Sequence, residues 1–119
     1  RTANAAKKYG ASLSAVKVSP TIKEAGRKAG LVKKTLDRNL LWEAQTPQVV
    51  KKDILFSAYK EIGKDSFNFS DESSLVEETG RAVRIVEGSY SNIKITTPED
   101  LIIAETILKR RPRTTRHKR

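Results

Sequence analysis

Residues 90–101 predict a strand, a tight turn and a helix from their pattern of apolar and polar positions. Apolar and polar side chains alternate over residues 93–96, which is typical of a half-buried strand. Thr97 then stands at the N-cap position, and Pro98 follows in the first helical position, where its missing N–H costs nothing. Asp100 lies three residues after the cap and completes a capping box. Apolar residues continue at helical spacing beyond it, so we take this stretch as the centre around which the chain is organised.

The same signals predict five more helices and strands in the rest of the chain. They are a helix over residues 2–9, a strand over 12–18, a helix over 51–62, a helix from Ser70 or Asp71 to residue 78, and a strand over 82–87. A glycine follows each of these three helices, as is common at a helix C-terminus. The mixture is an α/β layout. A sheet of this kind needs more strands than these, so we expect the strand over 12–18 to have unpaired edges.

Residues 20–36 predict a hairpin that protrudes from the sheet. Two short, half-polar runs flank a loop bracketed by Gly26 and Gly30, and neither run is apolar enough to be a core strand. The exposed edges and apolar side chains of such a strand pair are usually buried against another part of the protein, and a second subunit is the common solution. We therefore expect this arm to mediate a homodimer.

Residues 37–48 show no clear period and are predicted to form a connecting loop. The segment contains the only tryptophan of the chain, Trp42, which together with Leu41 would anchor the loop to the core. Polar loops pinned by a large aromatic side chain are also frequent binding loops. The pattern alone leaves both interpretations open.

Three cationic residues lie near the ends of predicted elements, which is where open α/β sheets bind their ligands. Lys94 stands between two isoleucines. It is either an exposed lysine on a solvated strand face or a cation held on a rigid element for a phosphate. Arg38, with Lys23 and several hydroxyls, presents the same choice. Cations and hydroxyls without a general base favour the binding of a phosphate.

Composition narrows the class of protein. With 119 residues, 37% of them hydrophobic, the chain is long enough for one small globular domain. It contains no cysteine, and its one histidine, His117, lies near the C-terminus, so we expect no Cys/His metal cluster. No apolar run is long enough to cross a membrane, and no apolar leader is visible, so we expect no membrane partner.

The net charge of +10 is concentrated at one end of the chain. Residues 109–119 carry seven Lys and Arg side chains and no acid, which leaves +3 for residues 1–108. A tail of this kind is either a disordered, solvated terminus or an arm that binds nucleic acid. We expect the disordered terminus, and hence no nucleic-acid partner.

Five sequence blocks, taken together and in order, indicate a family. They read TIK at residues 21–23, TLDR at 35–38, LWEAQTPQ at 41–48, DESSL at 71–75 and VEGSYSNIKITTPED at 86–100. Through these blocks, residues 1–108 closely resemble the 2-C-methyl-D-erythritol 4-phosphate cytidylyltransferases of the non-mevalonate isoprenoid pathway. The resemblance implies a Rossmann-like nucleotidyltransferase fold, present in part, with a mixed sheet and a protruding β-hairpin dimerisation arm.

The resemblance also implies an activity, the transfer of a cytidylyl group from CTP to 2-C-methyl-D-erythritol 4-phosphate with release of pyrophosphate. Lys94 matches the family lysine that orients the attacking phosphate against the α-phosphate of CTP. Arg38 matches the arginine that binds the substrate phosphate from the neighbouring subunit of a homodimer. Thr21 and Thr46 match substrate-binding threonines, and Ser70 keeps a hydroxyl where relatives often have threonine.

Some parts of the family pattern have no match among these residues. They are the glycine-rich loop that grips the CTP phosphates and the acidic position that binds Mg²⁺. The resemblance therefore implies the C-terminal half of a cytidylyltransferase, inactive by itself, from the bacterial cytoplasm or a plastid. A ribitol 5-phosphate cytidylyltransferase, an inactive fragment and a basic nucleic-acid-binding protein remain as alternatives.

Overall fold

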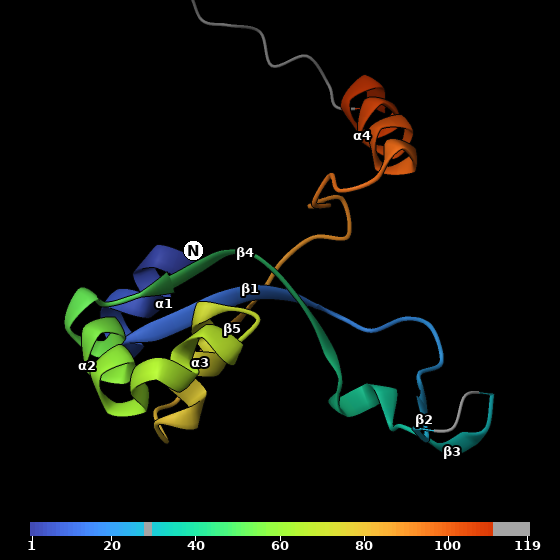
Figure 1. Ribbon diagram of the computed structural model, residues 1–119. Helices are drawn as coiled ribbons and strands as arrows, with labels where there is room; N and C mark the ends of the chain where they lie inside the picture. Colours follow the sequence, from blue (N-terminus) through green and yellow to red (C-terminus); the bar gives the residue numbers. More distant parts are fainter. Residues whose placement is uncertain (28–29, 111–119) are drawn as a thin grey trace, which may run out of the picture.

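The computed structural model describes residues 1–27 and 30–110 of the chain. Its elements are, in order, α1 (Thr2–Tyr9), β1 (Ala11–Lys17), β2 (Lys23–Ala25), β3 (Val32–Thr35), the 3₁₀ helix η1 (Arg38–Leu40), β4 (Trp42–Val50), α2 (Lys52–Ile62), the 3₁₀ helix η2 (Gly63–Asn68), α3 (Glu72–Glu78), β5 (Arg84–Glu87) and α4 (Pro98–Arg110). Figure 1 shows α1, α2 and α3 gathered around β1, β4 and β5, whereas the β2–β3 hairpin and α4 extend away from this body in different directions. The partial α/β fold expected from the sequence is confirmed.

The main sheet is mixed, with the strand order β4-β1-β5. β1 pairs with β4 in antiparallel register and with β5 in parallel register, so that Ala15 lies between Ala44 and Glu87. The strand predicted over residues 12–18 is therefore confirmed, but the expectation that it would have unpaired edges is wrong. β1 is the central strand because residues 42–50 supply a neighbour that the sequence pattern did not reveal.

The loop predicted for residues 37–48 is in large part the edge strand β4. The lack of a clear period argued against a strand there, and the segment also contains Pro47. The structure accommodates the proline in an irregularity of the pairing, because Leu13 pairs with Gln48 and its neighbour Ser14 pairs with Gln45. The two β4 residues between those pairs, including Pro47, have no partner on β1, so the missing N–H of the proline breaks no ladder hydrogen bond.

The two faces of β1 are covered by different helices. On one face, α1 packs on the strand, and the Ser12 hydroxyl donates a hydrogen bond of 2.7 Å to the Thr2 carbonyl. On the other face, a buried cluster joins the start of β1 to α2 and α3 through Ala58, Leu75 and Val76. β1 is buried over six of its seven residues. These packed helices fix the sheet from which the candidate site is built.

The hairpin predicted for residues 20–36 is confirmed as the antiparallel pair β2–β3. Glu24 forms ion pairs of 2.9 Å with Lys33 and 3.2 Å with Lys34 across the hairpin. Leu31 and Val32 of the arm are 71% and 61% exposed. The arm thus presents apolar side chains that nothing in its own chain covers, among the residues that the structure describes.

The strand predicted at residues 93–96 is wrong. These residues belong to no sheet, because no strand in the described part of the chain lies beside them to complete a ladder. Alternation of apolar and polar side chains predicts a strand with one buried face, but a strand also needs a neighbouring strand to accept and donate its backbone hydrogen bonds. Lys94 therefore sits in an irregular segment between β5 and α4, and not in the middle of a strand.

Helix α4 begins where the sequence predicts. Oδ2 of Asp100 accepts hydrogen bonds from the Thr97 N–H at 2.9 Å and from the Thr96 N–H at 3.0 Å, and Thr97 Oγ1 accepts one from the Asp100 N–H at 3.3 Å. No residue of α4 is buried.

None of the helices within residues 1–27 and 30–110 combines the length and apolar character needed to cross a bilayer. The basic tail predicted from residue 109 lies outside the described residues from 111 onward.

Candidate phosphate-binding site

Three of the five residues predicted for the site line one cavity of about 310 Å³. They are Lys94, Thr46 and Ser70. The remaining lining residues are Glu43, Ala44, Gln45, Gln48 and Asp71. Strand β4 supplies most of the wall, the segment before α3 supplies Ser70 and Asp71, and Lys94 arrives from the segment after β5. Among the eight residues that line the cavity, Lys94 is the only cation.

The side chain of Asp71 organises the wall between β4 and α3. It is the N-cap of α3, and its Oδ1 accepts hydrogen bonds from the Ser74 N–H at 2.8 Å and the Ser73 hydroxyl at 3.1 Å. Its Oδ2 accepts a hydrogen bond of 3.0 Å from the Gln48 side-chain amide. The cap that the sequence predicted for Ser70 or Asp71 is therefore provided by Asp71, which leaves the Ser70 hydroxyl at the cavity.

The same contacts set the protonation of Asp71. Partial burial raises the pKa of this carboxyl, but hydrogen bonds from Ser74, Gln48 and Ser73 outweigh that effect and hold the pKa below its ordinary value of 3.8. Asp71 is thus an anion whose oxygens already accept protein hydrogen bonds. Such a carboxylate is suited to holding the wall in place and is poorly suited to taking a proton from a substrate.

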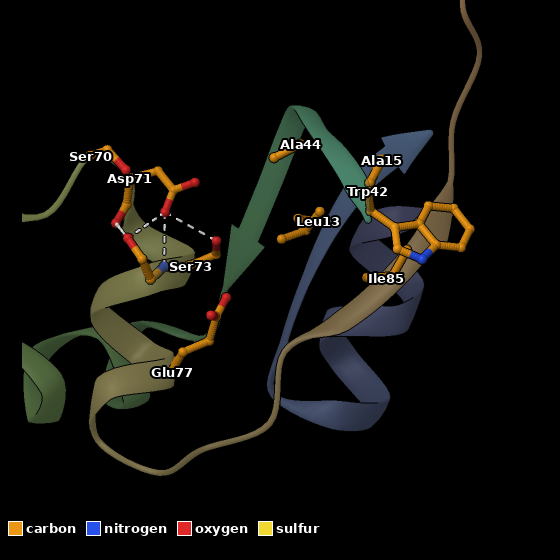
Figure 2. A pocket seen from close by; sticks show the side chains of 10 residues that line it. Leu13, Ala15, Trp42, Ala44, Ser70, Asp71, Ser73, Glu77 and Ile85 are labelled. Atoms are coloured by element: carbon orange, nitrogen blue, oxygen red, sulfur yellow. Dashed lines mark hydrogen bonds between the residues drawn. The ribbon is translucent and has the colours of Figure 1, made fainter. Parts of the chain in front are cut away.

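A second cavity of about 260 Å³ adjoins the first and shares Ala44, Ser70 and Asp71 with it. Figure 2 shows its lining side chains, with Leu13 and Ala44 on the strands between the α3 residues and Trp42. This cavity has no cation among its lining residues, and its ten lining residues are half apolar, from the strands, and half polar, from α3 and the segment before it. Asp71 therefore lies between the two cavities, and Lys94 lines only one of them.

The other two predicted site residues lie at the base of the arm. Arg38 opens η1, and its Nη1 donates a hydrogen bond of 2.7 Å to the Ser19 carbonyl. Thr21 precedes β2 and is exposed. Neither is among the eight residues that line the Lys94 cavity. A single chain therefore brings together Lys94, Thr46 and Ser70 but leaves Arg38 and Thr21 elsewhere.

Sequence reasoning did not assign several of the lining residues to the site. Gln45 and Gln48 were placed only in a polar segment of undecided role, Asp71 was assigned only to a cap, and Glu43 was not considered. They all fall within two of the sequence blocks that carried the family resemblance, at residues 41–48 and 71–75. The signal was thus present in the blocks, but the pairing of β4 with β1 was needed to bring the blocks together.

The described residues do not fit a magnesium site. Among residues 1–27 and 30–110, no three His, Cys, Asp or Glu side chains gather closely enough to hold a metal ion. Within the cavity, the oxygens of Asp71 are already occupied by hydrogen bonds from serine and glutamine side chains and from a backbone N–H. We derive no chemical step through a metal from these residues.

Solved structures match this fold over most of the chain. A 4-diphosphocytidyl-2C-methyl-D-erythritol synthase from Anaerococcus prevotii matches with a TM-score of 0.79 at 37% identity, over 92% of this chain and 48% of that one. A 2-C-methyl-D-erythritol 4-phosphate cytidylyltransferase from Thermus thermophilus matches with a TM-score of 0.75 at 29% identity, over 89% of this chain and 52% of that one. The fold is that of part of a nucleotidyltransferase.

The sequence comparisons identify the family within this class. The family model for IspD, 2-C-methyl-D-erythritol 4-phosphate cytidylyltransferase, matches residues 1–110, and the chain belongs to this family. The 2-C-methyl-D-erythritol 4-phosphate cytidylyltransferase of Pelotomaculum thermopropionicum is 50% identical over 107 residues, which are 90% of this chain and 44% of that protein. This chain spans about half the length of the curated relatives that it matches.

Proposed function

We propose that these residues form the substrate-phosphate side of a cytidylyltransferase that transfers a cytidylyl group from CTP to 2-C-methyl-D-erythritol 4-phosphate. The observation that carries the proposal is the cavity in which Lys94 faces the same space as Thr46 and Ser70. Membership of the family supplies the reaction, and the relatives' names supply the substrate. In this reaction a phosphate oxygen of the substrate forms a bond to the α-phosphorus of CTP, and pyrophosphate leaves.

The cavity provides the groups that such a transfer needs from this side. The ammonium of Lys94 attracts and orients the attacking phosphate, and it stabilises the negative charge that accumulates as the new bond forms. The hydroxyls of Thr46 and Ser70 each offer a hydrogen-bond donor to phosphate or sugar-alcohol oxygens. Asp71 keeps the wall rigid, because its hydrogen bonds join β4 to α3. No nucleophilic side chain is required by this chemistry.

Arg38 and Thr21 complete the site from a second copy of the chain in this proposal. Both lie at the base of an arm that extends from the sheet and exposes Leu31 and Val32. Burying that arm against a partner would cover its apolar side chains and carry Arg38 toward the partner's cavity. Sedimentation of a full-length enzyme from which residues 22–36 are deleted is expected to give monomers, and a persistent dimer would contradict this part of the proposal.

The family resemblance implies a Mg²⁺ ion, and we do not assign the residues of this cavity as its ligands. The carboxylate of Asp71 is engaged by protein hydrogen bonds, and Glu43 is a single exposed carboxylate. When bound with CTP, the ion would neutralise the triphosphate charge. The residues of this chain act on the other reactant, by binding its phosphate and orienting it for attack.

A chimeric enzyme tests the proposal. Residues 1–110 would replace the matching stretch of the Pelotomaculum thermopropionicum relative, and pyrophosphate release would be followed with CTP and either 2-C-methyl-D-erythritol 4-phosphate or ribitol 5-phosphate. We expect turnover with the first substrate only. A well-folded chimera that turned over only ribitol 5-phosphate, or neither substrate, would overturn the proposal.

Lys94→Ala in that chimera tests the role of the cation. Because the lysine is expected to act most strongly as charge builds in the transition state, kcat should fall about a hundredfold while KM changes little. Lys60→Ala is the matched control, since Lys60 is an exposed lysine near the end of α2. If both variants lose equal activity, or if Lys94→Ala unfolds the protein, Lys94 is a structural residue.

A further inference from the structure

After Gly88, whose N–H donates a hydrogen bond of 2.8 Å to the Ala15 carbonyl of β1, the segment that carries Lys94 is attached to the sheet by side-chain hydrogen bonds. β5 ends at Glu87, and residues 88–97 form no strand. Two side-chain hydrogen bonds then tether its first half to the main sheet. The Gln45 side-chain amide donates to the Ser89 carbonyl at 2.9 Å, and the Tyr90 hydroxyl donates to the Lys17 carbonyl at 2.7 Å. Both tethers lie four or more residues before Lys94.

The tether nearest to Lys94 is made by Asn92. Its side-chain nitrogen Nδ2 donates a hydrogen bond of 2.6 Å to the backbone carbonyl of Thr46. Its backbone N–H closes a turn by donating to the Ser89 carbonyl at 2.9 Å. Asn92 thus connects the segment that carries Lys94 to the β4 residue whose side chain lines the same cavity.

Thr46 belongs to β4 but has no pairing partner on β1. The register of the β1–β4 pair skips it, because Leu13 pairs with Gln48 and Ser14 pairs with Gln45. Its carbonyl therefore accepts a hydrogen bond from outside the β1–β4 ladder. The hydrogen bond from Asn92 therefore constrains two irregular parts of the backbone at once. One is Thr46 in β4, and the other is the loop that carries Lys94, two residues after Asn92.

We propose that Asn92 is a positioning residue, which sets the distance between the Lys94 ammonium and the Thr46 hydroxyl across the phosphate-binding cavity. This inference rests on the proposed function for the role of Lys94, and on the structure for the tether. A lysine has a long, flexible side chain, so its backbone anchor determines how often the ammonium occupies the position that contacts phosphate. Catalysis is sensitive to errors of about 1 Å in such a position.

A double-mutant cycle in the chimeric enzyme distinguishes positioning from a structural role. Asn92→Ala should lower kcat about tenfold, with KM changed less than about twofold. In the background of Lys94→Ala, the same substitution should cost less than about twofold, because the group that it positions is already gone. Asn92→Leu, which keeps the volume but lacks the donor, should behave as Asn92→Ala does. Asn4→Ala, an equivalent truncation at an exposed position of α1, is the matched control.

The cycle has clear contrary outcomes. A tenfold loss that persists in the Lys94→Ala background would make Asn92 a structural residue, and activity equal to that of Asn4→Ala would remove its role altogether. The activity of the unmutated chimera reports on the proposed function separately.

A measurement on the 119-residue chain tests the tether without any activity. Backbone ¹⁵N relaxation should show order parameters at residues 93–95 that fall below about 0.6 in Asn92→Ala and stay near those of the parent in Asn4→Ala. Unchanged order parameters in Asn92→Ala would overturn the inference even if the chimera were inactive.

Discussion

The side-chain amide of Gln48 in β4 donates a hydrogen bond of 3.0 Å to Oδ2 of Asp71, the N-cap of α3. The oxygen of the same Gln48 side chain accepts a weaker hydrogen bond of 3.4 Å from the Ser73 N–H. One glutamine of an edge strand therefore completes the cap of a short helix, and it holds in place Asp71, which lines both cavities. Stability and the shape of the site depend on the same few contacts.

Truncation of Asp71 should cost stability. Asp71→Ala removes the helix cap and leaves the Ser74 N–H and the Gln48 amide without their acceptor, so we expect a loss of about 1–2 kcal/mol in the free energy of unfolding. Urea denaturation measures this loss. Asp65→Ala is the control, because Asp65 is an exposed carboxylate in η2. Equal losses in both variants would mean that the Asp71 contacts contribute nothing specific.

The contribution of Asp71 should disappear in acid. Its folded-state pKa is below the ordinary value of 3.8, so the folded protein favours the ionised carboxylate. The stabilisation is therefore fully present above 3.8 and is lost as the pH falls below 3.8 through the lower folded-state pKa. The difference in free energy of unfolding between the parent and Asp71→Asn should shrink over that window. A difference that stays constant with pH would contradict this assignment.

A side chain at Gly88 should force neighbouring side chains to move. A Cβ at this position would collide with the Gln45 side chain and with the Ser14 hydroxyl, which lies about 2.6 Å from it. Gly88→Ala should displace Gln45 from its hydrogen bond to Ser89, lower the melting temperature and loosen the segment that leads to Lys94. Gly26→Ala is the matched control, because nothing lies within 4 Å of a Cβ there. Equal melting temperatures for the two variants would refute the close approach.

Arg38 should not be replaceable by lysine in an active chimera. A guanidinium binds phosphate through a planar fork of two donors, which an ammonium cannot reproduce. Arg38→Lys should therefore raise KM for the sugar-alcohol phosphate and also reduce kcat, with KM for CTP changed least. Steady-state kinetics with each substrate varied in turn measure this. Normal KM values for both substrates would remove Arg38 from the proposed site.

Features that depend on nearby residues could be predicted from the chain alone. The helices were predicted within two residues of their observed starts, because caps such as Asp71 and Thr97 act within one turn, and the positive-φ glycines Gly10 and Gly63 likewise mark where α1 and α2 end. The hairpin arm followed from turn residues between two short runs. The sequence blocks were also sufficient to indicate the family, and they contain Lys94 and Thr46, whereas Ser70 directly precedes the block at residues 71–75.

Contacts between distant parts of the chain determine which segments are strands and which site residues meet. A strand is completed by hydrogen bonds to a neighbour that is distant in sequence, so alternation at residues 93–96 predicted a strand that has no neighbour among the described residues. β4 has little alternation and contains Pro47, yet it is a strand because β1 pairs with it on either side of the irregularity. The tertiary fold likewise brings Thr46 and Lys94 to one cavity and leaves Arg38 at the base of the arm. Local patterns could not reveal this division, because it follows from contacts such as that between Asn92 and Thr46, which are 46 positions apart.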